Sequence, residues 1–434
     1  MSVALSAAIL LLLLALFLGA GSWVFSGLML VGASAMYLVL DFSPARIGSI
    51  ATKVISSSAI SWELAAIPMF MWMGDIIFRT DISQRLFRGL APMVARIPGG
   101  LLHTNVFGCT VFAAISGSST ATTATVGKIT IPELQARGYD LRLASGSLAG
   151  AGSFGLLIPP SIAMIVYGVL AEVSIAKLFA AGLLPGLMMA GLYAGYIAIV
   201  STLDPSRAPK FEGEVSLRTL GHGLLELLPI MLLMSVVLGS IYSGVATPSE
   251  AAAVGVLGAV VITVVTGQFS LSLMRESLMA TIRVSAMIMV LIAASAFLSA
   301  AIAYMHLPTM ITQKISALNL SPYGVLLILA ALYIVLGMFL DGTSMTVMTV
   351  PIAVPLIVQA GFDPLWFGIY LVIMIEMSAL TPPVGLNLFV LQGLTRQSLG
   401  ETVRAAVPFF LLLCLGTAIL AAFPQIVLWL PNAL

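Results

Sequence analysis

The sequence predicts an all-α polytopic membrane protein made of two copies of one unit, inserted in opposite orientations as an inverted repeat. Three observations predict this fold. The chain is 60% hydrophobic and only 8% charged. A set of landmarks recurs at one fixed offset along the chain, and each copy contains an odd number of predicted membrane crossings. Each copy is also expected to hold one interfacial helix and one re-entrant hairpin.

Composition sets the class of protein. Soluble domains contain roughly 25% charged residues, whereas this chain of 434 residues has repeated apolar stretches of about 20 residues, the length that crosses a bilayer. The net charge of +1 predicts no nucleic-acid partner. Cys109 and Cys414 lie in apolar segments and predict neither a metal site nor a disulfide. No basic residue precedes Arg46, so we expect the first apolar run to be a retained span, not a signal peptide.

An internal duplication explains the order of the landmarks. An offset of 223 residues aligns the following pairs: Pro132 with Pro355, Gly138-Tyr139-Asp140 with Gly361-Phe362-Asp363, Pro159-Pro160 with Pro382-Pro383, and Ser118 and Thr120 with Asp341 and Thr343. Single matches between prolines are common, but one register shared by separate landmarks indicates a repeat.

The first copy is expected to contain the following elements: spans at about 2–19 and 23–40, an amphipathic interfacial helix at 43–58, a span at 60–78, a polar stretch at 79–98, a hairpin at about 100–134, a broken span at 143–170 and a span at 178–202. The second copy is expected to contain spans at 223–242 and 249–266, an amphipathic piece at 268–277, a span at 278–303, a hairpin at about 322–359, a broken span at 364–393 and a span at 405–430. Five crossings in a copy is an odd number, so the second copy is inverted relative to the first, as in many secondary transporters.

The predicted division into parts follows the repeat. Its boundaries are 1–58 for scaffold spans and the first interfacial helix, 59–202 for the transport elements of the first repeat, 203–222 for a polar linker, 223–277 for scaffold spans and the second interfacial helix, and 278–434 for the transport elements of the second repeat.

Charge tests this topology independently. If 79–98 lies in the cytoplasm, the outside holds only four basic residues: Arg46, Lys53, Lys177 and Lys314. All the others then fall in cytoplasmic loops, which is a strong positive-inside bias. In this orientation both termini face outward, the first hairpin enters from the cytoplasm and the second enters from outside.

The broken elements predict a binding site. Pro159-Pro160 and Pro382-Pro383 remove helical donors and leave free the carbonyls of Gly155, Leu156, Ser378 and Ala379. Irregular backbone at membrane depth persists only where protein buries it or where it lines a watery cavity. Free carbonyls beside hydroxyls suit a small hard cation such as Na⁺, and half-helix N-termini suit an anionic group. The alternative is structural, since Ser and Thr often serve close packing and Pro often makes only a kink.

Single polar residues add further candidates. Asp341 and Glu376 lie deepest in apolar sequence, and an intramembrane carboxylate is a candidate for function by default. Glu376 is at least as well explained as a group that orients a broken helix. Asn387 is expected to contact a ligand or to bond a neighbouring helix. Glu250 follows Thr247-Pro248-Ser249 and is expected to cap a helix, and His103 is expected to be structural.

At these residues the chain resembles the large membrane subunit of tripartite ATP-independent periplasmic (TRAP) transporters. The resemblance is carried by Ser116-Gly117-Ser118-Ser119, Ile131-Pro132-Glu133-Leu134, Gly138-Tyr139-Asp140, Ile158-Pro159-Pro160-Ser161, Thr381-Pro382-Pro383-Val384-Gly385, Pro98-Gly99-Gly100 and Asp341-Gly342. It covers nearly the whole chain. One departure is Thr122, where many members of the family carry Asp.

The resemblance implies an elevator-type transporter of the ion-transporter superfamily, coupled to Na⁺. It implies Na⁺ ligands at Ser116, Ser119, Gly155 and Pro159 for one site, and at Gly342, Thr343, Thr381 and Val384 for the other. Substrate is then expected between the tips, near Ser118, Ser119, Thr120, Ser161, Thr343 and Asn387. The implied partners are a small four-span membrane subunit, a periplasmic solute-binding protein and an organic acid, in the lipid bilayer of the bacterial inner membrane.

The sequence therefore predicts Na⁺-coupled secondary import of a small carboxylate delivered by a binding protein, and no enzyme. The alternative is an independent ion-coupled symporter of the same superfamily. No G-x-x-x-x-G-K-[ST] loop is present, which argues against ATP hydrolysis by that route. Three rival classes remain: a channel, an intramembrane serine hydrolase using Ser118 with His103 or Lys128, and a passive scaffold subunit.

Overall fold

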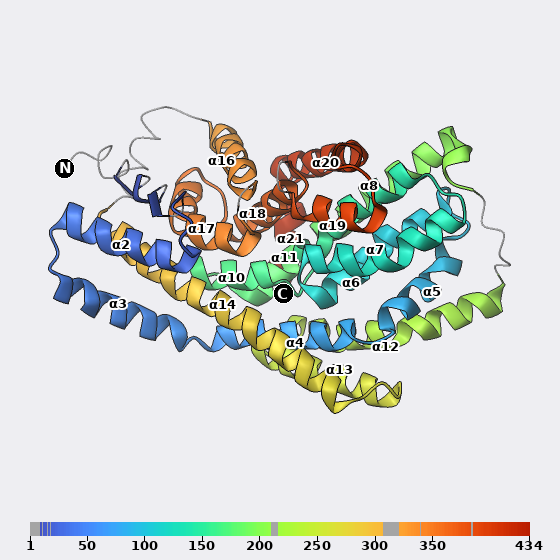
Figure 1. Cartoon of the computed structure of the whole chain (residues 1–434), viewed down its shortest axis with the longest axis horizontal. Coiled ribbons are helices and arrows are strands. Elements are labelled where there is room, and N and C mark those ends of the chain that lie inside the picture. Colours follow the sequence, from blue (N-terminus) through green and yellow to red (C-terminus); the bar gives the residue numbers. More distant parts are fainter. Residues whose placement is uncertain are drawn as a thin grey trace.

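The structure is a computed structural model, and it describes residues 9–10, 12–14, 16–17, 19–209, 216–306, 321–338, 340–382 and 385–434. Within these ranges every regular element is a helix. Most of the helices run roughly along the long axis of the molecule (Figure 1).

The first repeat contains the following elements: α2 (Val24–Leu40), α3 (Pro44–Ala59), η1 (Trp62–Ala65), α4 (Ala66–Phe78), α5 (Ile82–Val94), η2 (Gly100–Leu102), α6 (His103–Ser116), α7 (Ser119–Ala136), α8 (Leu141–Gly152), α9 (Phe154–Leu157), α10 (Ile162–Leu170), α11 (Ile175–Leu203) and η3 (Pro205–Arg207). The pair α6–α7 is the expected first hairpin, and α8–α10 is the expected broken span.

The second repeat contains the following elements: α12 (Leu217–Tyr242), α13 (Pro248–Val265), α14 (Leu271–Tyr304), α16 (Pro322–Gly337), α17 (Gly342–Gln359), α18 (Pro364–Ala379), α19 (Leu386–Thr395), α20 (Leu399–Ala422) and α21 (Gln425–Ala433). Both ends of α17 lie 223 residues after those of α7, and α18 begins 223 residues after α8. The duplication seen in the sequence is therefore also a duplication of backbone structure.

One element differs from expectation. We expected a separate amphipathic piece at 268–277 before a span at 278–303, but α14 is a single helix of 34 residues. In the first repeat, by contrast, α3 meets the η1–α4 segment at a bend of 58°. The range of α14 contains neither Gly nor Pro, the two residues that most readily interrupt a helix. The copies thus diverge at the join between the interfacial helix and the span.

Packing groups the helices into two units. In the first, which we call the frame (α2–α5 and α12–α14), α4 packs along α13, α5 along α12 and α14 along α2. Gly89 and Gly223 let α5 and α12 approach closely, since a Cβ on either would lie within 2.8 Å of the other residue's carbonyl oxygen. In the second, the core unit (α6–α11 and α16–α21), α8 packs on α20 and α7 on α19. The frame forms the lower edge of the molecule in Figure 1.

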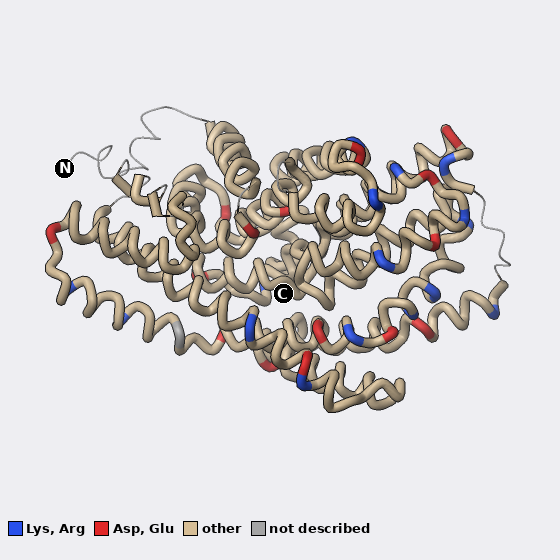
Figure 2. The backbone as a smooth tube through the Cα atoms, viewed as in Figure 1, with Lys and Arg blue, Asp and Glu red and all other residues tan. Residues whose placement is uncertain are grey.

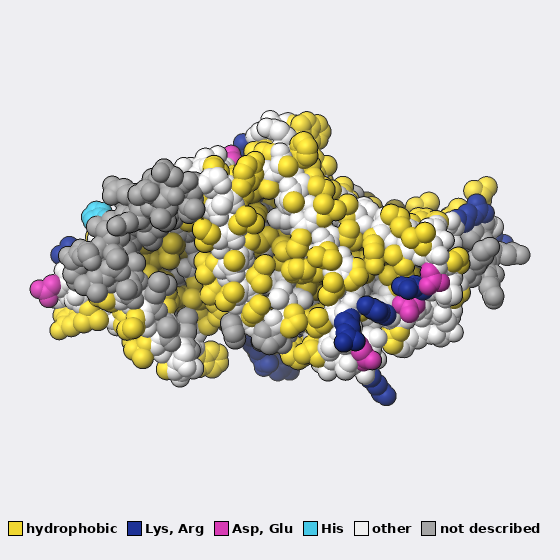
Figure 3. All heavy atoms as spheres, turned by 90° about the horizontal axis from the view of Figure 1, so that it is seen from above, with side chains coloured by type: hydrophobic (Ala, Val, Ile, Leu, Met, Phe, Trp, Pro, Cys, Tyr) yellow, Lys and Arg dark blue, Asp and Glu magenta, His cyan; other side chains and the backbone are white. Residues whose placement is uncertain are grey.

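The surface is that of a protein embedded in a bilayer. Large hydrophobic side chains are exposed along α12, α13, α16 and α20, and Figure 3 shows a broad hydrophobic face with most of its charged side chains toward one end. Lys and Arg concentrate in the half of the molecule that holds α5 (Figure 2). Among the described residues, six helices are long and apolar enough to cross a membrane, or up to eight if each of two bent pairs is one span.

Candidate functional site

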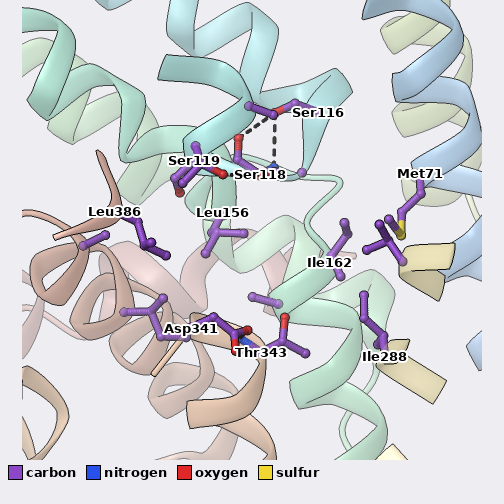
Figure 4. A pocket seen from close by; sticks show the side chains of 18 of the residues that line it. Met71, Ser116, Ser118, Ser119, Leu156, Ile162, Ile288, Asp341, Thr343 and Leu386 are labelled. Atoms are coloured by element: carbon purple, nitrogen blue, oxygen red, sulfur yellow. Dashed lines mark hydrogen bonds between the residues drawn. The ribbon is translucent and has the colours of Figure 1, made fainter. Parts of the chain in front are cut away.

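The two hairpin tips and the two broken helices converge on one cleft of about 370 Å³ (Figure 4). The core unit contributes the tip segments Ser116–Ala121 and Asp341–Thr343, together with Leu156, Ile162, Glu376 and Asn387. The frame closes the opposite side with α4 and α14, through residues that include Met71, Asp75, Thr281 and Ile288. The cleft therefore lies at the boundary between the two units.

The first tip is a turn held by its own hydroxyl groups. Helix α6 ends at Ser116, Gly117 adopts a left-handed conformation with φ of 56°, and α7 begins at Ser119. The Ser116 hydroxyl accepts a hydrogen bond from the Ser118 backbone N–H (3.2 Å) and lies 2.6 Å from the Thr122 hydroxyl. The Thr122 hydroxyl donates to the Ser118 carbonyl (2.8 Å). This network fixes the Ser118 carbonyl and the start of α7.

Gly155 brings the first broken helix directly against this tip. A Cβ at Gly155 would lie 2.5 Å from the backbone of Ser118 and Ser119, so no larger residue fits without displacing the tip. The Pro159-Pro160 peptide that follows is cis. Ser161 then caps α10 by accepting a long hydrogen bond from the Met164 N–H (3.5 Å).

The second tip carries a carboxylate. Asp341 caps α17 by accepting hydrogen bonds from the backbone N–H groups of Thr343 (3.0 Å) and Ser344 (3.2 Å). This contact satisfies donors that a helix N-terminus otherwise leaves free, and it places a negative charge at the positive end of the helix dipole. The α17 N-terminus is thus already occupied by an anionic group of the same chain.

The second broken helix restarts at α19 without a side-chain cap. Its N-cap residue is Gly385, in a left-handed conformation with φ of 44°. Asn387, in the first turn, is fully buried and lines the cleft, yet neither polar atom of its side chain has a partner. A buried amide without partners costs free energy, and both polar atoms of this side chain are open to hydrogen bonding from the cleft.

Glu376 on α18 connects the two repeats. Its side chain is buried, and the Ser119 hydroxyl donates a hydrogen bond to Oε1. Its Oε2 has no partner. Sequence alone singled out Glu376, but only as a group deep in a broken span, because a contact between residues 257 positions apart leaves no local pattern.

The positive potential in the cleft comes from helix N-termini and not from basic side chains. Among the described residues that line it, none is Lys, Arg or His. Four helices begin at the cleft: α7, α10, α17 and α19. Two of them, α10 and α17, have side-chain caps, whereas neither α7 nor α19 has one. Free N–H groups at an uncapped helix N-terminus bind anions.

Comparison with known proteins decides the family. Residues 9–426 match the family model described as "Tripartite ATP-independent periplasmic transporter, DctM component". The chain belongs to this family. It is therefore a multi-pass membrane protein of a transporter family, which is not a class of enzyme.

Curated relatives agree with this assignment over more than nine-tenths of the chain. The chain is 36% identical over 405 residues to the C4-dicarboxylate TRAP transporter large permease protein DctM of Pseudomonas aeruginosa, covering 93% of each chain. It is 31% identical over 416 residues to the isethionate TRAP transporter permease protein DctMQ of Oleidesulfovibrio alaskensis, covering 95% of this chain and 64% of that protein.

The DctM fold also resembles that of a solved transporter. The crystal structure of the Alcanivorax borkumensis YdaH transporter matches with a TM-score of 0.64 and 16% sequence identity, covering 90% of this chain and 89% of that one. At this identity the likeness shows the fold alone, and it supports the helical transporter architecture expected from the sequence.

The site residues expected in this DctM chain fall into three groups. Those that line the cleft are Ser116, Ser118, Ser119, Thr120, Asp341, Gly342, Thr343, Glu376 and Asn387. Gly155, Pro159, Ser161 and Thr381 lie in the adjoining breaks; the Thr381 hydroxyl donates to the Met377 carbonyl (2.8 Å). Val384 lies outside the described residues. The lining from α4 and α14 was missed, because nothing in the sequence of those spans marks them as facing a site.

Two structural expectations are confirmed. Glu250 forms a capping box with Thr247 at the start of α13, accepting a hydrogen bond from the Thr247 N–H (2.8 Å). His103 is buried, and its Nε2 lies 2.8 Å from the Pro98 carbonyl oxygen. A serine hydrolase gains no support, because the Ser118 hydroxyl lies beside Thr120 (3.3 Å) and His103 is engaged at Pro98.

Proposed function

We propose that this chain is the large membrane subunit of a tripartite importer, and that the cleft between the hairpin tips binds a small organic acid. One observation carries the proposal: four helix N-termini, two of them uncapped, meet at a cleft whose described lining contains no basic side chain. An acid group binds there through backbone N–H groups, with Asn387 beside one end and Ser119 and Thr120 at the other.

The substrate class follows from the same chemistry and from the relatives. Those relatives are named for a C4-dicarboxylate and for isethionate, both small anions. Backbone N–H groups recognise an acid oxygen and not a particular carbon skeleton, so the cleft suits several such acids. In the tripartite arrangement the choice among them lies largely with the binding protein.

The proposal also includes coupling of transport to Na⁺. The donor set around each tip fits a hard monovalent cation, because it consists of oxygens: hydroxyls of Ser116 and Ser119 and backbone carbonyls near Gly155 and Pro159 in the first repeat. In the second repeat Thr343 and Thr381 supply hydroxyls and Gly342 supplies a backbone carbonyl, whereas Val384, which the family resemblance also implies, lies outside the described residues. Among the described residues there is no cluster of three or more His, Cys, Asp or Glu, as a divalent transition metal would favour. A bound cation would supply positive charge that favours entry of the acid.

Transport in this proposal is a movement of the core unit against the frame. The proposal includes α4, α5 and the whole of α14 in the frame, whereas the sequence boundaries at 58 and 277 place α4, α5 and most of α14 with the moving elements. Polar contacts link these frame helices: the Trp72 indole donates to the Ser277 hydroxyl (3.1 Å), Arg79 pairs with Glu276 (2.8 Å), and the Asp81 N–H donates to Gln268 (2.8 Å).

In this scheme we assign the structure to an inward-facing state. The cleft extends to Asp75 and Phe78, next to the polar segment 79–98 that charge places in the cytoplasm. A second hollow of about 610 Å³ lies between the frame and the core unit, bordered by Ser57, Glu63 and Glu172. It adjoins the turn between α10 and α11, which is expected on the outer side. Movement of the core unit outward closes this hollow as the cleft opens to the outside.

The experiment that tests the proposed function is reconstitution in proteoliposomes. We expect little uptake by this chain alone, and uptake driven by a Na⁺ gradient when the small four-span subunit and the liganded binding protein are added outside. Robust uptake of free acid by the chain alone would favour an independent symporter. Uptake that follows a pH gradient and ignores Na⁺ would contradict the assigned ion.

A further inference from the structure

Glu376 is a buried carboxyl group with no basic partner. It is 1% exposed, and one of its oxygens, Oε2, makes no hydrogen bond. The equivalent position of the first repeat, by the offset of 223, is Ser153, whose hydroxyl bonds the Gly150 carbonyl of its own helix. The second repeat has therefore placed an acidic group where the first has a small hydroxyl with a local partner.

The surroundings of Glu376 are rich in oxygen and lack positive charge. Ser119 donates to Oε1, and the Leu156 backbone lies beside the same carboxyl. The other acidic residues that line the cleft, Asp75 and Asp341, share its sign, and the described lining residues include no Lys, Arg or His. Tyr193, on α11, is a further titratable group near Glu376. A carboxylate removed from water without a positive partner is strongly destabilised.

The contacts of Glu376 coincide with the first hairpin tip. Ser119, which bonds Glu376, is the first residue of α7, and Gly155 lies against the Ser118–Ser119 peptide. The Ser119 hydroxyl and the Glu376 carboxyl group thus meet beside the Ser118–Ser119 peptide, against which Gly155 packs. This is the donor chemistry of a hard cation, and a carboxylate supplies the negative charge that the neutral ligands lack.

We propose that Glu376 is the anionic ligand of the cation bound at the first hairpin tip. This inference rests on the proposed Na⁺ coupling and deepens it. The cation neutralises the buried carboxylate and, with Ser119, ties α7 of the first repeat to α18 of the second. The site at the second tip differs, because its carboxylate, Asp341, is engaged in capping α17. Cation affinity at the first tip therefore depends on a residue of the other repeat.

The test is thermal unfolding of the purified full chain in detergent, titrated with NaCl against choline chloride at constant ionic strength. A ligand that binds only the folded state raises the melting temperature with concentration. We expect Glu376→Gln, which keeps the size and removes the charge, to move the Na⁺ midpoint upward by about tenfold or more. Glu250→Gln, which alters a carboxylate outside the cleft, leaves the midpoint unchanged.

The outcomes separate this inference from the proposed function. If wild-type protein is not stabilised by Na⁺, the proposed coupling fails. If wild-type protein is stabilised and Glu376→Gln shows the same midpoint, the coupling stands and Glu376 is not a ligand. Should Glu376→Gln fail to fold, Glu376→Asp keeps the charge on a shorter side chain. A shifted midpoint in that variant supports the assignment, and an unshifted one overturns it.

Discussion

Each repeat brings two helix N-termini to the cleft and caps one of them, but the two repeats cap opposite ones. In the first repeat the hairpin helix α7 is uncapped, and the helix after the break, α10, is capped by Ser161. In the second repeat the hairpin helix α17 is capped by Asp341, and the helix after the break, α19, is uncapped. The cleft therefore presents one uncapped N-terminus from each repeat, at different structural positions.

This difference shows that duplication preserved the backbone while the chemistry diverged. Helices α7 and α17 share their bounds at one offset, yet Ser118 at the start of one corresponds to Asp341 at the start of the other. Likewise Ser153 corresponds to Glu376. An inverted pair with identical side chains would offer two equivalent sites, whereas this pair builds a single asymmetric cleft.

The largest effect on uptake is expected where the first hairpin tip contacts the broken helix of the same repeat. Gly155→Ala places a Cβ 2.5 Å from the Ser118–Ser119 backbone, and overpacking of this kind costs about 1–3 kcal/mol. We expect uptake by the reconstituted three-component system to fall by about tenfold or more. Gly191→Ala is the matched control, since its Cβ would meet nothing within 4 Å. Equal activity of both variants would show that the tip does not depend on this contact.

Removing the unpartnered amide of Asn387 tests the uncapped N-terminus of α19 in the second repeat. We expect Asn387→Ala to raise the KM for uptake by about tenfold, the worth of a hydrogen bond to a charged group, with little change in melting temperature. Asn105→Ala is the comparison, because Asn105 is equally buried but donates to the Ala144 carbonyl (3.2 Å) and the Ser147 hydroxyl (2.9 Å). That variant should lower stability and leave KM unaltered. The reverse pattern would assign Asn387 to packing.

A smaller effect on uptake is expected from removing the cap of α17, the capped helix N-terminus of the second repeat. Asp341→Ala removes the α17 cap, which is worth about 1 kcal/mol of stability. We expect a lower melting temperature and a modest loss of uptake, and near wild-type stability for Asp341→Asn, which still caps. An unchanged melting temperature in Asp341→Ala would mean that the carboxylate acts on the ligand and not on the helix.

The smallest effect on stability is expected in the frame, at Asp81, which does not line the cleft. Burial alone would raise the pKa of Asp81, but the hydrogen bond from Gln268 and the charge of Arg85 outweigh it and hold the pKa below its ordinary value. A carboxyl with a lowered folded pKa stabilises the protein above its unfolded pKa of about 4, and this stability is lost as the pH falls through the folded value. Asp81→Asn should cost less than about 1 kcal/mol at neutral pH and nothing in acid. A difference that grows in acid would contradict this sign.

Sequence reasoning recovered most of the architecture because the determinants are local or repeated. The hairpins expected at 100–134 and 322–359 correspond to α6–α7 and α16–α17, and the span expected at 178–202 corresponds to α11. Apolar length, proline pairs and the fixed offset carry that information. Two features of the site could not be predicted: the hydrogen bond between Ser119 and Glu376, and the cleft lining from α4 and α14. Both are tertiary contacts, which leave no spacing pattern in the sequence.

The central claim is that the core unit moves as one body against the frame. It is tested most directly by electron paramagnetic resonance distances between spin labels at exposed positions, in a chain with Cys109 and Cys414 replaced by alanine. Three labelled pairs suffice: Leu257 with Leu411 between frame and core unit, Leu38 with Leu257 within the frame, and Leu327 with Leu411 within the core unit. We predict that adding Na⁺ and the liganded binding protein changes only the first distance. A constant first distance during active uptake, or changes within either unit, would contradict the account.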